Sequence, residues 1–314
     1  MAERLTRVAD DLSTAVRLGR DALFANPDAG SDPAAHLPQL EAALRSGSDP
    51  GRLWRTDTGA VGLALWEPVG PIGLAVQLLY LAPTIASVDS YRRFLLALDR
   101  EVAPVAFLPS RLAGLTPEVQ AGMLRELAFR PYSRSDMVLP AERPTPVEDP
   151  SRGLVVRPYR PEDAEAVARV HAAAFEHHFD RYLFLEDLDP VEDARAMLRG
   201  LSAGRWGPFR PAASMVAEAP GEIIGSTLVV GTPTGALIAD VAVAPAHGGR
   251  GVGRSLMLAT IRALRAGAAD PIRLVVTEGN PRAVRLYERL GFVRRATFQE
   301  WYRSTRVPVA PEAD

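Results

Sequence analysis

The chain of 314 residues contains no cysteine and no lysine. Without cysteine it has no disulfides, no thiolate nucleophile and no acyl-cysteine intermediate. Without lysine, all 36 basic residues are arginines, which stay charged and bind carboxylates or phosphates through a planar fork of donors. Alanine, proline and arginine are abundant, so we interpret the imbalance as a GC-rich coding bias.

Long apolar runs and a strong net charge are also missing. No segment approaches the roughly 18 apolar residues of a membrane span, and the N-terminus has no signal-peptide pattern. The net charge of −2 argues against binding to nucleic acid or to an anionic membrane. A hydrophobic content of 47% and a charged content of 24% are typical of globular proteins. We therefore expect a cytoplasmic protein of about two domains.

A segment without periodicity separates two patterned halves. Residues 140–153 are rich in proline, glutamate and aspartate, which is typical of a linker. We expect an N-terminal domain over residues 1–140, a linker over 141–153, a C-terminal domain over 154–305 and a tail over 306–314. Apolar spacing predicts a first helix over residues 4–24 and two final strands over 292–303.

A glycine-rich loop lies between a strand predicted over residues 236–244 and a helix predicted over 252–266. It contains four glycines and no acidic residue. Glycine accepts positive φ, so several backbone N–H groups of such a loop can converge on one point. The start of the helix adds its own unpaired N–H groups and its positive dipole end. This combination favours an anionic ligand, most naturally a phosphate.

Two common nucleotide motifs do not fit this loop. A P-loop needs a lysine, which the chain lacks. A Rossmann fingerprint closes a first βαβ unit and is followed by an acid about twenty residues later. Here the loop follows a late strand, and Asp270 sits at a turn before Pro271.

Two blocks of sequence resemble the GNAT superfamily of N-acetyltransferases. That family has a pyrophosphate loop Gln/Arg-x-x-Gly-x-Gly/Ala after a strand that ends Val-x-Pro. The run here is Gly248-Gly249-Arg250-Gly251-Val252-Gly253, with Gly248 departing from the family's Gln or Arg. The second block, from Asn280 through Ala283 and Tyr287 to Gly291-Phe292, is similar to the signature Asn-x-x-Ala-x-x-x-Tyr-x-x-x-Gly-Phe.

The resemblance implies an α/β (α+β) fold with a mixed, mostly antiparallel sheet flanked by helices. It also implies direct acetyl transfer from acetyl-CoA to a primary amine. The backbone of the loop, including Val252, would hold the pyrophosphate, and Arg250 and Arg254 would either neutralise phosphates or remain solvated. The strand edge at Val241 and Val243 would meet the pantetheine arm and the acetyl carbonyl.

Tyr287 matches the family's proton donor to the CoA sulfur, the alternative being a core tyrosine. Asn280 matches an asparagine that contacts the pantetheine arm, and it also has the position of a helix N-cap before Pro281.

Asp240 is the best candidate for the base that removes the proton of the amine. Strict alternation places it with Ile238 and Ala242 on one face, opposite Val241 and Val243. A carboxylate in so apolar a strand should be desolvated, which raises its pKa, unless it pairs with an arginine. Glu278 is the second candidate.

The loop after the first helix of the C-terminal half contains further polar residues. His177, His178 and Asp180 either border the acceptor site or lie on the surface. Adjacent histidines without a further cluster lack metal-ligand spacing, so we expect no metal.

The two halves are a degenerate repeat. Residues 62–82 align with 224–244 without a gap, and Leu127-Ala128-Phe129 aligns with Leu290-Gly291-Phe292. The first half has Asp89 in place of Gly251, Leu124 in place of Tyr287 and Leu78 in place of Asp240. The sequence therefore predicts two GNAT folds in tandem, with one active site in the C-terminal half. The tandem layout is similar to that of the mycothiol synthases, a two-domain group within the superfamily.

The acceptor is expected to be the amine of a small molecule or of a protein, and the chain a monomer or homodimer. The alternative is a non-catalytic protein that binds an acyl-CoA and acts as a regulator.

Overall fold

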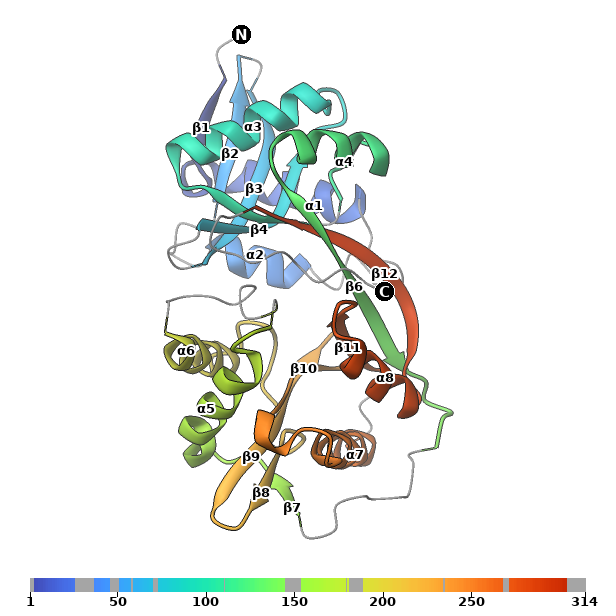
Figure 1. Cartoon of the computed structure of the whole chain (residues 1–314). Coiled ribbons are helices and arrows are strands. Elements are labelled where there is room, and N and C mark those ends of the chain that lie inside the picture. Colours follow the sequence, from blue (N-terminus) through green and yellow to red (C-terminus); the bar gives the residue numbers. More distant parts are fainter. Residues whose placement is uncertain are drawn as a thin grey trace. The chain divides into compact units, whose positions relative to one another are not determined.

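The computed structural model describes residues 3–25, 37–45, 51–57, 59–69, 73–109, 111–144, 154–178, 180, 189–233, 235–267 and 271–303 (Figure 1). Two compact units make up the chain. Unit 1 comprises residues 1–132 and 298–308, and unit 2 comprises residues 133–297 and 309–314. Within the described ranges, no helix has the length and apolarity needed to cross a membrane.

Unit 1 is a mixed sheet covered by helices on both faces. Its strands lie in the order β1 (Arg4–Arg7), β2 (Gly51–Thr56), β3 (Gly59–Val69), β4 (Gly73–Leu81), β5 (Val105–Leu108) and the end of β12 (Val293–Tyr302). β5 runs parallel to β4, and the other recorded pairs in the unit are antiparallel. Alternate strand residues pack against α1 (Leu12–Ala25) and α2 (Leu37–Arg45), or against α3 (Val88–Glu101) and α4 (Pro117–Glu126).

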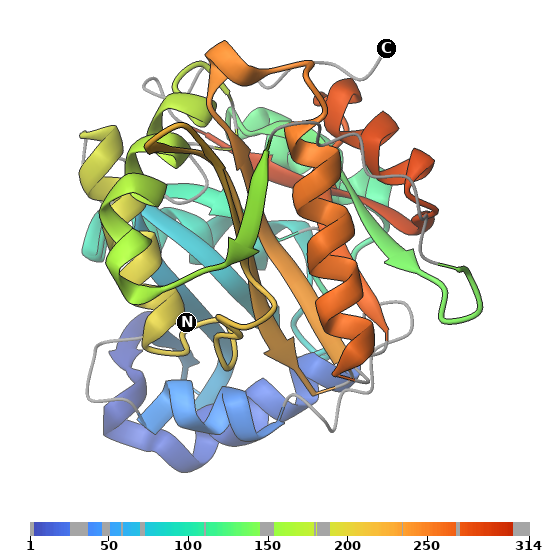
Figure 2. The same cartoon turned by 90° about the horizontal axis from the view of Figure 1, so that it is seen from below.

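Unit 2 repeats this plan. Its strands lie in the order β6 (Arg130–Leu139, from Ser133 onward), β11 (Ile272–Thr277), β10 (Gly235–Val243), β9 (Glu222–Thr232), β8 (Met215–Ala219) and β7 (Val155–Pro158). One face packs against α5 (Ala164–Phe175) and α6 (Pro190–Ser202). The other packs against α7 (Val252–Ala266) and α8 (Pro281–Arg289), and α7 runs alongside β9 and β10 (Figure 2).

Each unit includes strand residues from the opposite half of the chain. β6 pairs with β11 from Arg134 to Leu139, so this part of the N-terminal half belongs to unit 2. Trp301 and Tyr302 at the end of β12 pair with β5 of unit 1. The compact units therefore divide the chain differently from the linear boundaries at residues 140, 154 and 305 that the sequence suggests. Linear boundaries cannot represent such an exchange of strands.

Two predicted elements differ from the structure. The helix expected over residues 4–24 begins only at Leu12, because Arg4–Arg7 pairs with β2 as an edge strand. Leu5 and Val8 fit a helical spacing, but pairing with a distant strand overrides it. The two strands expected over residues 292–303 are the single strand β12.

The repeat seen in the sequence is visible in the backbone. Both units contain the succession strand, strand, helix, strand, helix: β3–β4–α3–β5–α4 in unit 1 and β9–β10–α7–β11–α8 in unit 2. After the last helix of each, the backbone turns through the left-handed region, at Ala128 with φ of 62° and at Gly291 with φ of 95°. Ala128 is the one non-glycine residue with positive φ among the described ranges.

This equivalence predicts opposite responses to matched substitutions. Gly291→Ala should lower the free energy of unfolding by about 1–2 kcal/mol, because a Cβ is strained at this φ. The added Cβ would also lie 3.3 Å from Cδ of Arg143. Ala128→Gly relieves the same strain and should leave stability unchanged or raise it by up to about 1 kcal/mol. Chemical denaturation of the full chain measures both, and equal destabilisation by the two changes would contradict the equivalence.

Candidate active site

The site begins where two parallel strands of unit 2 part. β10 and β11 are in register only over Ala236–Ile238 and Ile272–Leu274, although β10 continues to Val243 and β11 to Thr277. On the other side of β10, Ala244 N–H donates to Ile224 O at 2.9 Å. In an antiparallel pair, alternate residues bond to the partner strand. Val241 and Val243 therefore direct their backbone polar groups toward the opening, as expected for a strand edge.

A β-bulge on β10 decides which face carries Asp240. The register with β9 shifts between Ile238 and Asp240. Ile238 and Val241 both pack into the cluster formed with α7 and α8, whereas Asp240 contacts His171 of α5. The expectation that Asp240 shares a face with Ile238 is therefore wrong, because the bulge breaks the alternation between them. Its effect is to turn a carboxylate toward α5 beside the point where the strands part.

The glycine loop presents backbone donors at the end of β10. Gly249 and Gly251 have φ of 77° and 86°, the left-handed conformation that glycine adopts without strain. Gly251 is the N-cap of α7, and no side chain caps this helix. The first turn of α7 contains no acidic residue. The free N–H groups of α7 and its positive dipole end therefore remain available to an anion.

A cavity of about 560 Å³ joins the loop to the opening between the strands. Of the residues predicted from the sequence, those that line it are Val241, Val243, Gly248, Gly249, Gly251, Val252, Gly253, Arg254, Asn280 and Tyr287. Ala174 and Phe175 at the end of α5, with His178, complete the wall on the α5 side.

The charge of the lining is positive. Arg254 from α7 and Arg282, Arg285 and Arg289 from α8 line the cavity, and none of its described lining residues is acidic. Nε of Arg254 is buried and has no hydrogen-bond partner in the described part of the chain. The guanidinium of Arg282 lies against the loop, so that a Cβ on Gly248 would be 3.0 Å from Nη2. A glycine at this position lets the cation and the backbone donors face the same space.

Helix α8 supplies two of the predicted side chains. Asn280 is the N-cap of α8, and its Oδ1 accepts a hydrogen bond from Ala283 N–H at 3.1 Å. Its predicted position as a cap is confirmed, and it also lines the cavity. Tyr287 is buried against Phe292, with ring centroids 6.1 Å apart. Burial, and next the negative charge of Asp240, raise the pKa of the Tyr287 hydroxyl, so the phenol keeps its proton at neutral pH.

Asp240 is paired with a histidine. Nδ1 of His171 lies 3.2 Å from Oδ1 of Asp240, and the two side chains are 12% and 6% exposed. The arginine partner that the sequence left open for Asp240 is not found among the described residues. His171 stacks on Phe175 with ring centroids 4.6 Å apart, and Phe175 meets His178 edge to face at 5.7 Å.

The polar loop after α5 reaches the end of β11. Thr277 Oγ1 donates to Asp180 Oδ1 at 2.5 Å, and Asp180 N–H donates to Nδ1 of His178 at 3.1 Å. His178 lines the cavity, whereas the neighbouring His177 is exposed. Of the three polar residues that the sequence singled out here, His178 and Asp180 are thus partly buried and His177 is exposed.

Three candidate residues, Asp240, Glu278 and Arg250, are not among the residues that line the cavity. Glu278 accepts a short hydrogen bond from Ser135 and pairs with Arg294 at 3.3 Å. Its carboxylate is therefore engaged at the boundary of β6, β11 and β12. Arg250 follows the glycines but does not line the cavity.

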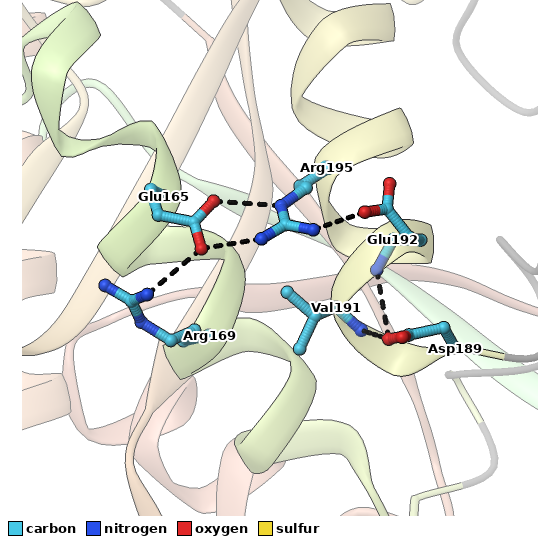
Figure 3. A network of polar contacts seen from close by, with 6 residues as sticks. All are labelled: Glu165, Arg169, Asp189, Val191, Glu192 and Arg195. Atoms are coloured by element: carbon cyan, nitrogen blue, oxygen red, sulfur yellow. Dashed lines mark hydrogen bonds and ion pairs between the residues drawn. The ribbon is translucent and has the colours of Figure 1, made fainter.

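Polar contacts on the surface hold α5 against α6 (Figure 3). Arg195 of α6 donates to both carboxylate oxygens of Glu165 on α5, at 2.9 and 2.7 Å, and Arg169 donates to the same carboxylate at 3.0 Å. Asp189 caps α6 by accepting from Val191 N–H at 2.8 Å. The Arg195 guanidinium lowers the pKa of Glu165. Two-pronged arginine pairs fix geometry better than single ones, so this network orients the helix that carries His171 and Phe175.

His171 and the arginines of α8 belong to the site but were not predicted as site residues from the sequence. Arg282, Arg285 and Arg289 have the spacing of one helical face, a signal that periodicity alone could have supplied. His171 gave no such signal, because its partner lies 69 positions later on a strand.

The comparisons with known proteins agree with this geometry. Residues 172–292 match the acetyltransferase (GNAT) family. A mycothiol acetyltransferase of Kineococcus radiotolerans is 40% identical over 154 residues, which are 48% of this chain and 46% of that protein. One of Frankia casuarinae is 34% identical over 183 residues, or 52% and 49%. The chain thus spans about half the length of the curated relatives it matches.

Solved structures extend the likeness to almost the whole chain. A GCN5-related N-acetyltransferase from Sphaerobacter thermophilus superposes with a TM-score of 0.68 at 17% identity, covering 98% of this chain and 97% of that one. A tandem GNAT protein from the clavulanic acid biosynthesis pathway gives 0.60 at 17% identity, with 96% and 98% covered. At such identities the likeness concerns the fold, and it confirms the prediction of two GNAT folds in tandem.

Unit 1 has the same opening, but a tyrosine fills it. Tyr91 occupies the place that Gly253 has in unit 2, and it is fully buried. Its hydroxyl accepts from Leu81 N–H at 3.3 Å and donates to Ala113 O at 2.9 Å. Leu81 aligns with Val243, so a side chain satisfies the strand edge that is open in unit 2. The start of α3 is closed as well, because Ser87 accepts from Ser90 N–H at 3.2 Å.

Removing only the hydroxyl of Tyr91 tests this account. Tyr91→Phe leaves the buried N–H of Leu81 and the carbonyl of Ala113 without this partner, and should lower the free energy of unfolding by about 1–3 kcal/mol. Tyr80→Phe changes a tyrosine that is also buried but packs in the core on the α1 side of the sheet, and it is the control that should cost less. Chemical denaturation compares the two. Equal costs would mean that the Tyr91 hydroxyl does not support the strand edge.

Proposed function

The chain carries a domain of the acetyltransferase (GNAT) family in residues 172–292, and we propose that it transfers an acetyl group from acetyl-CoA to a primary amine. The reaction takes place at one active site, in unit 2. The observation that carries this proposal is the uncapped, glycine-rich start of α7, which opens on an arginine-lined cavity beside the edge of β10.

The residues of the loop fit the diphosphate of coenzyme A. Backbone N–H groups from Gly249 to Gly253 and the dipole of α7 would hold it, with Val252 as the first residue of the helix. The N–H of Gly248 already donates to Pro245 O at 3.0 Å, so this residue would contribute by leaving space rather than as a donor. Arg254 would add a charge from inside the cavity. Arg250, which does not line the cavity, would act only at longer range. A side chain at Gly248 would meet Pro245 O at 3.1 Å, so the loop is shaped for close approach to its backbone.

The opening between β10 and β11 fits the pantetheine arm. The edge at Val241 and Val243 would take up its amides as an added strand would, and Asn280 would contact it from α8. The thioester supplies an acyl carbon that a neutral amine can attack.

Asp240 is the proposed base. Its Oδ2 is buried and has no hydrogen-bond partner in the described part of the chain, so it can accept a proton from a bound ammonium group. Glu278 is the second choice, because Ser135 and Arg294 already engage its carboxylate.

Tyr287 is the proposed acid. It lines the cavity, and its raised pKa keeps the hydroxyl protonated until negative charge develops on the sulfur. The hydroxyl then donates toward the sulfur as the C–S bond breaks.

The acceptor would enter beside Phe175 and His178. Because relatives of this chain bear the name mycothiol acetyltransferase, an amine related to mycothiol is the first small molecule to test. A protein amine is the second class. Release of free coenzyme A with a panel of amines tests the proposal: turnover with at least one amine is expected. Tight binding of acetyl-CoA without any turnover would favour a regulatory acyl-CoA-binding protein instead.

A negative charge placed in the loop should weaken binding of the cosubstrate. Gly251→Asp puts a carboxylate where the diphosphate would lie, and should weaken acetyl-CoA binding at least tenfold, as measured by calorimetry. Gly251→Ala separates the effect of backbone strain from that of charge. The matched control Asp89→Gly, at the equivalent position of unit 1, should leave the affinity for acetyl-CoA unchanged. Unchanged binding in Gly251→Asp would remove the loop from the site.

Removing the hydroxyl of Tyr287 should affect chemistry rather than binding. Tyr287→Phe keeps the ring packed against Phe292 but removes the donor, so kcat should fall by about 10²–10⁴-fold with little change in acetyl-CoA affinity. Steady-state kinetics and calorimetry measure the two quantities. A kcat equal to that of the wild type would exclude Tyr287 as the acid.

A further inference from the structure

His171 is a largely buried titratable residue, and it has no role in the proposed acetyl transfer. It lies on α5, one turn before Phe175, which lines the cavity. Its Nδ1 is buried and lies 3.2 Å from Oδ1 of Asp240, within the distance of an ion pair but without an aligned hydrogen bond. The opposite oxygen of Asp240 has no hydrogen-bond partner in the described part of the chain. One oxygen therefore contacts the imidazole, and the other is buried without a hydrogen-bond partner among the described residues.

Few other titratable groups lie near His171 and Asp240 among the described residues. The titratable groups gathered near this pair are Tyr287 from α8, and His178 and Asp180 from the segment after α5. The phenyl ring of Phe175 contacts both His171 and His178. The arginine-mediated ion pairs of α5 lie on its exposed face, at Glu165 and Arg169, and do not involve His171.

We propose that His171 and Asp240 form one proton-accepting pair, in which His171 positions the Asp240 carboxylate and shares the proton that the acceptor's ammonium group releases. This inference rests on the proposed function and names the substrate form it requires: a cationic amine, drawn to the carboxylate and made neutral there. When His171 is protonated before the amine arrives, it neutralises Asp240 and the pair is inactive. The active form is neutral imidazole beside carboxylate.

The protons and electrons of the step balance. The ammonium group loses one proton to the pair, and the nitrogen lone pair forms the C–N bond. The C–S bond breaks with its electrons on sulfur, which takes the proton of Tyr287. The remaining extra proton on nitrogen restores the phenol, and the pair releases its own proton to solvent.

The pair predicts a specific pH dependence. With saturating acceptor, kcat of the wild type should rise with pH as the pair loses its proton. In His171→Asn a carboxylate remains without the imidazole, and a carboxylate ordinarily binds a proton more weakly than an imidazole. The rising limb of the pH profile should therefore move to lower pH by at least one unit. kcat on the plateau should fall at least tenfold, because the imidazole no longer positions the carboxylate or shares its proton.

Two neighbouring histidines provide matched controls. His177→Asn changes an exposed side chain and should leave both limb and plateau as in the wild type. His178→Asn changes the histidine on the other side of Phe175. If the rising limb of the pH profile moves in His178→Asn and does not move in His171→Asn, the proposal is overturned. Asp240→Asn keeps the imidazole and should lower kcat at every pH. Melting curves and acetyl-CoA affinity show that each variant is folded.

The outcomes separate this inference from the proposed function. If the wild type acetylates no amine, the function itself fails. If the wild type acetylates an amine, and folded His171→Asn has the same rising limb in its pH profile as the wild type, only the proposed pair is refuted. As a measurement without turnover, Asp240→Asn should change the NMR chemical shifts of the His171 ring and leave those of His177 in place.

Discussion

The parting of β10 from β11 is the constraint on which the rest of unit 2 depends. Backbone polar groups of a strand must be satisfied, and a ladder that ends after three residues leaves an edge that something else has to complete. The bulge between Ile238 and Asp240 lies at this point. It bends the strand and turns a carboxylate toward α5. The orientation of the proposed base thus follows from one local irregularity, which lies where the two parallel strands part.

The two units show two solutions of the same problem. In unit 1 the edge at Leu81 is completed from within, by the hydroxyl of Tyr91, and the start of α3 is capped by Ser87. In unit 2, Gly253 leaves that space empty, and α7 has no side-chain cap. The difference is not one of fold, since the order of elements is shared. Unit 1 fills its opening with a side chain, whereas the opening of unit 2 is left available to a ligand.

The sequence predicted what is local. The glycine loop, the cap at Asn280 and the helix over residues 252–266 each follow from residues adjacent in the chain. The contact of His171 with Asp240 was not predictable from the sequence, because it joins a helix to a strand far along the chain. It also depends on a β-bulge, and no residue type in this stretch marks the bulge. The exchange of β6 and β12 between the units was missed for the same reason. Each half of the sequence contains enough predicted strands to form its own sheet. Which strands pair, however, depends on which sheet edge remains unpaired in the folded chain.

The proposed acid and base are coupled through charge. The pKa of Tyr287 is raised first by burial and then by the negative charges of Asp240 and Asp180. A phenol whose pKa is held above its ordinary value of about 10 gives its proton to a thiolate, whose conjugate thiol has an ordinary pKa of about 8.5, only against an unfavourable difference. When the His171–Asp240 pair takes up a proton from the ammonium group, however, one of those negative charges is neutralised. The phenol then becomes a better donor in the same step that makes the amine a nucleophile, so that protonation of the base strengthens the acid when the sulfur needs it.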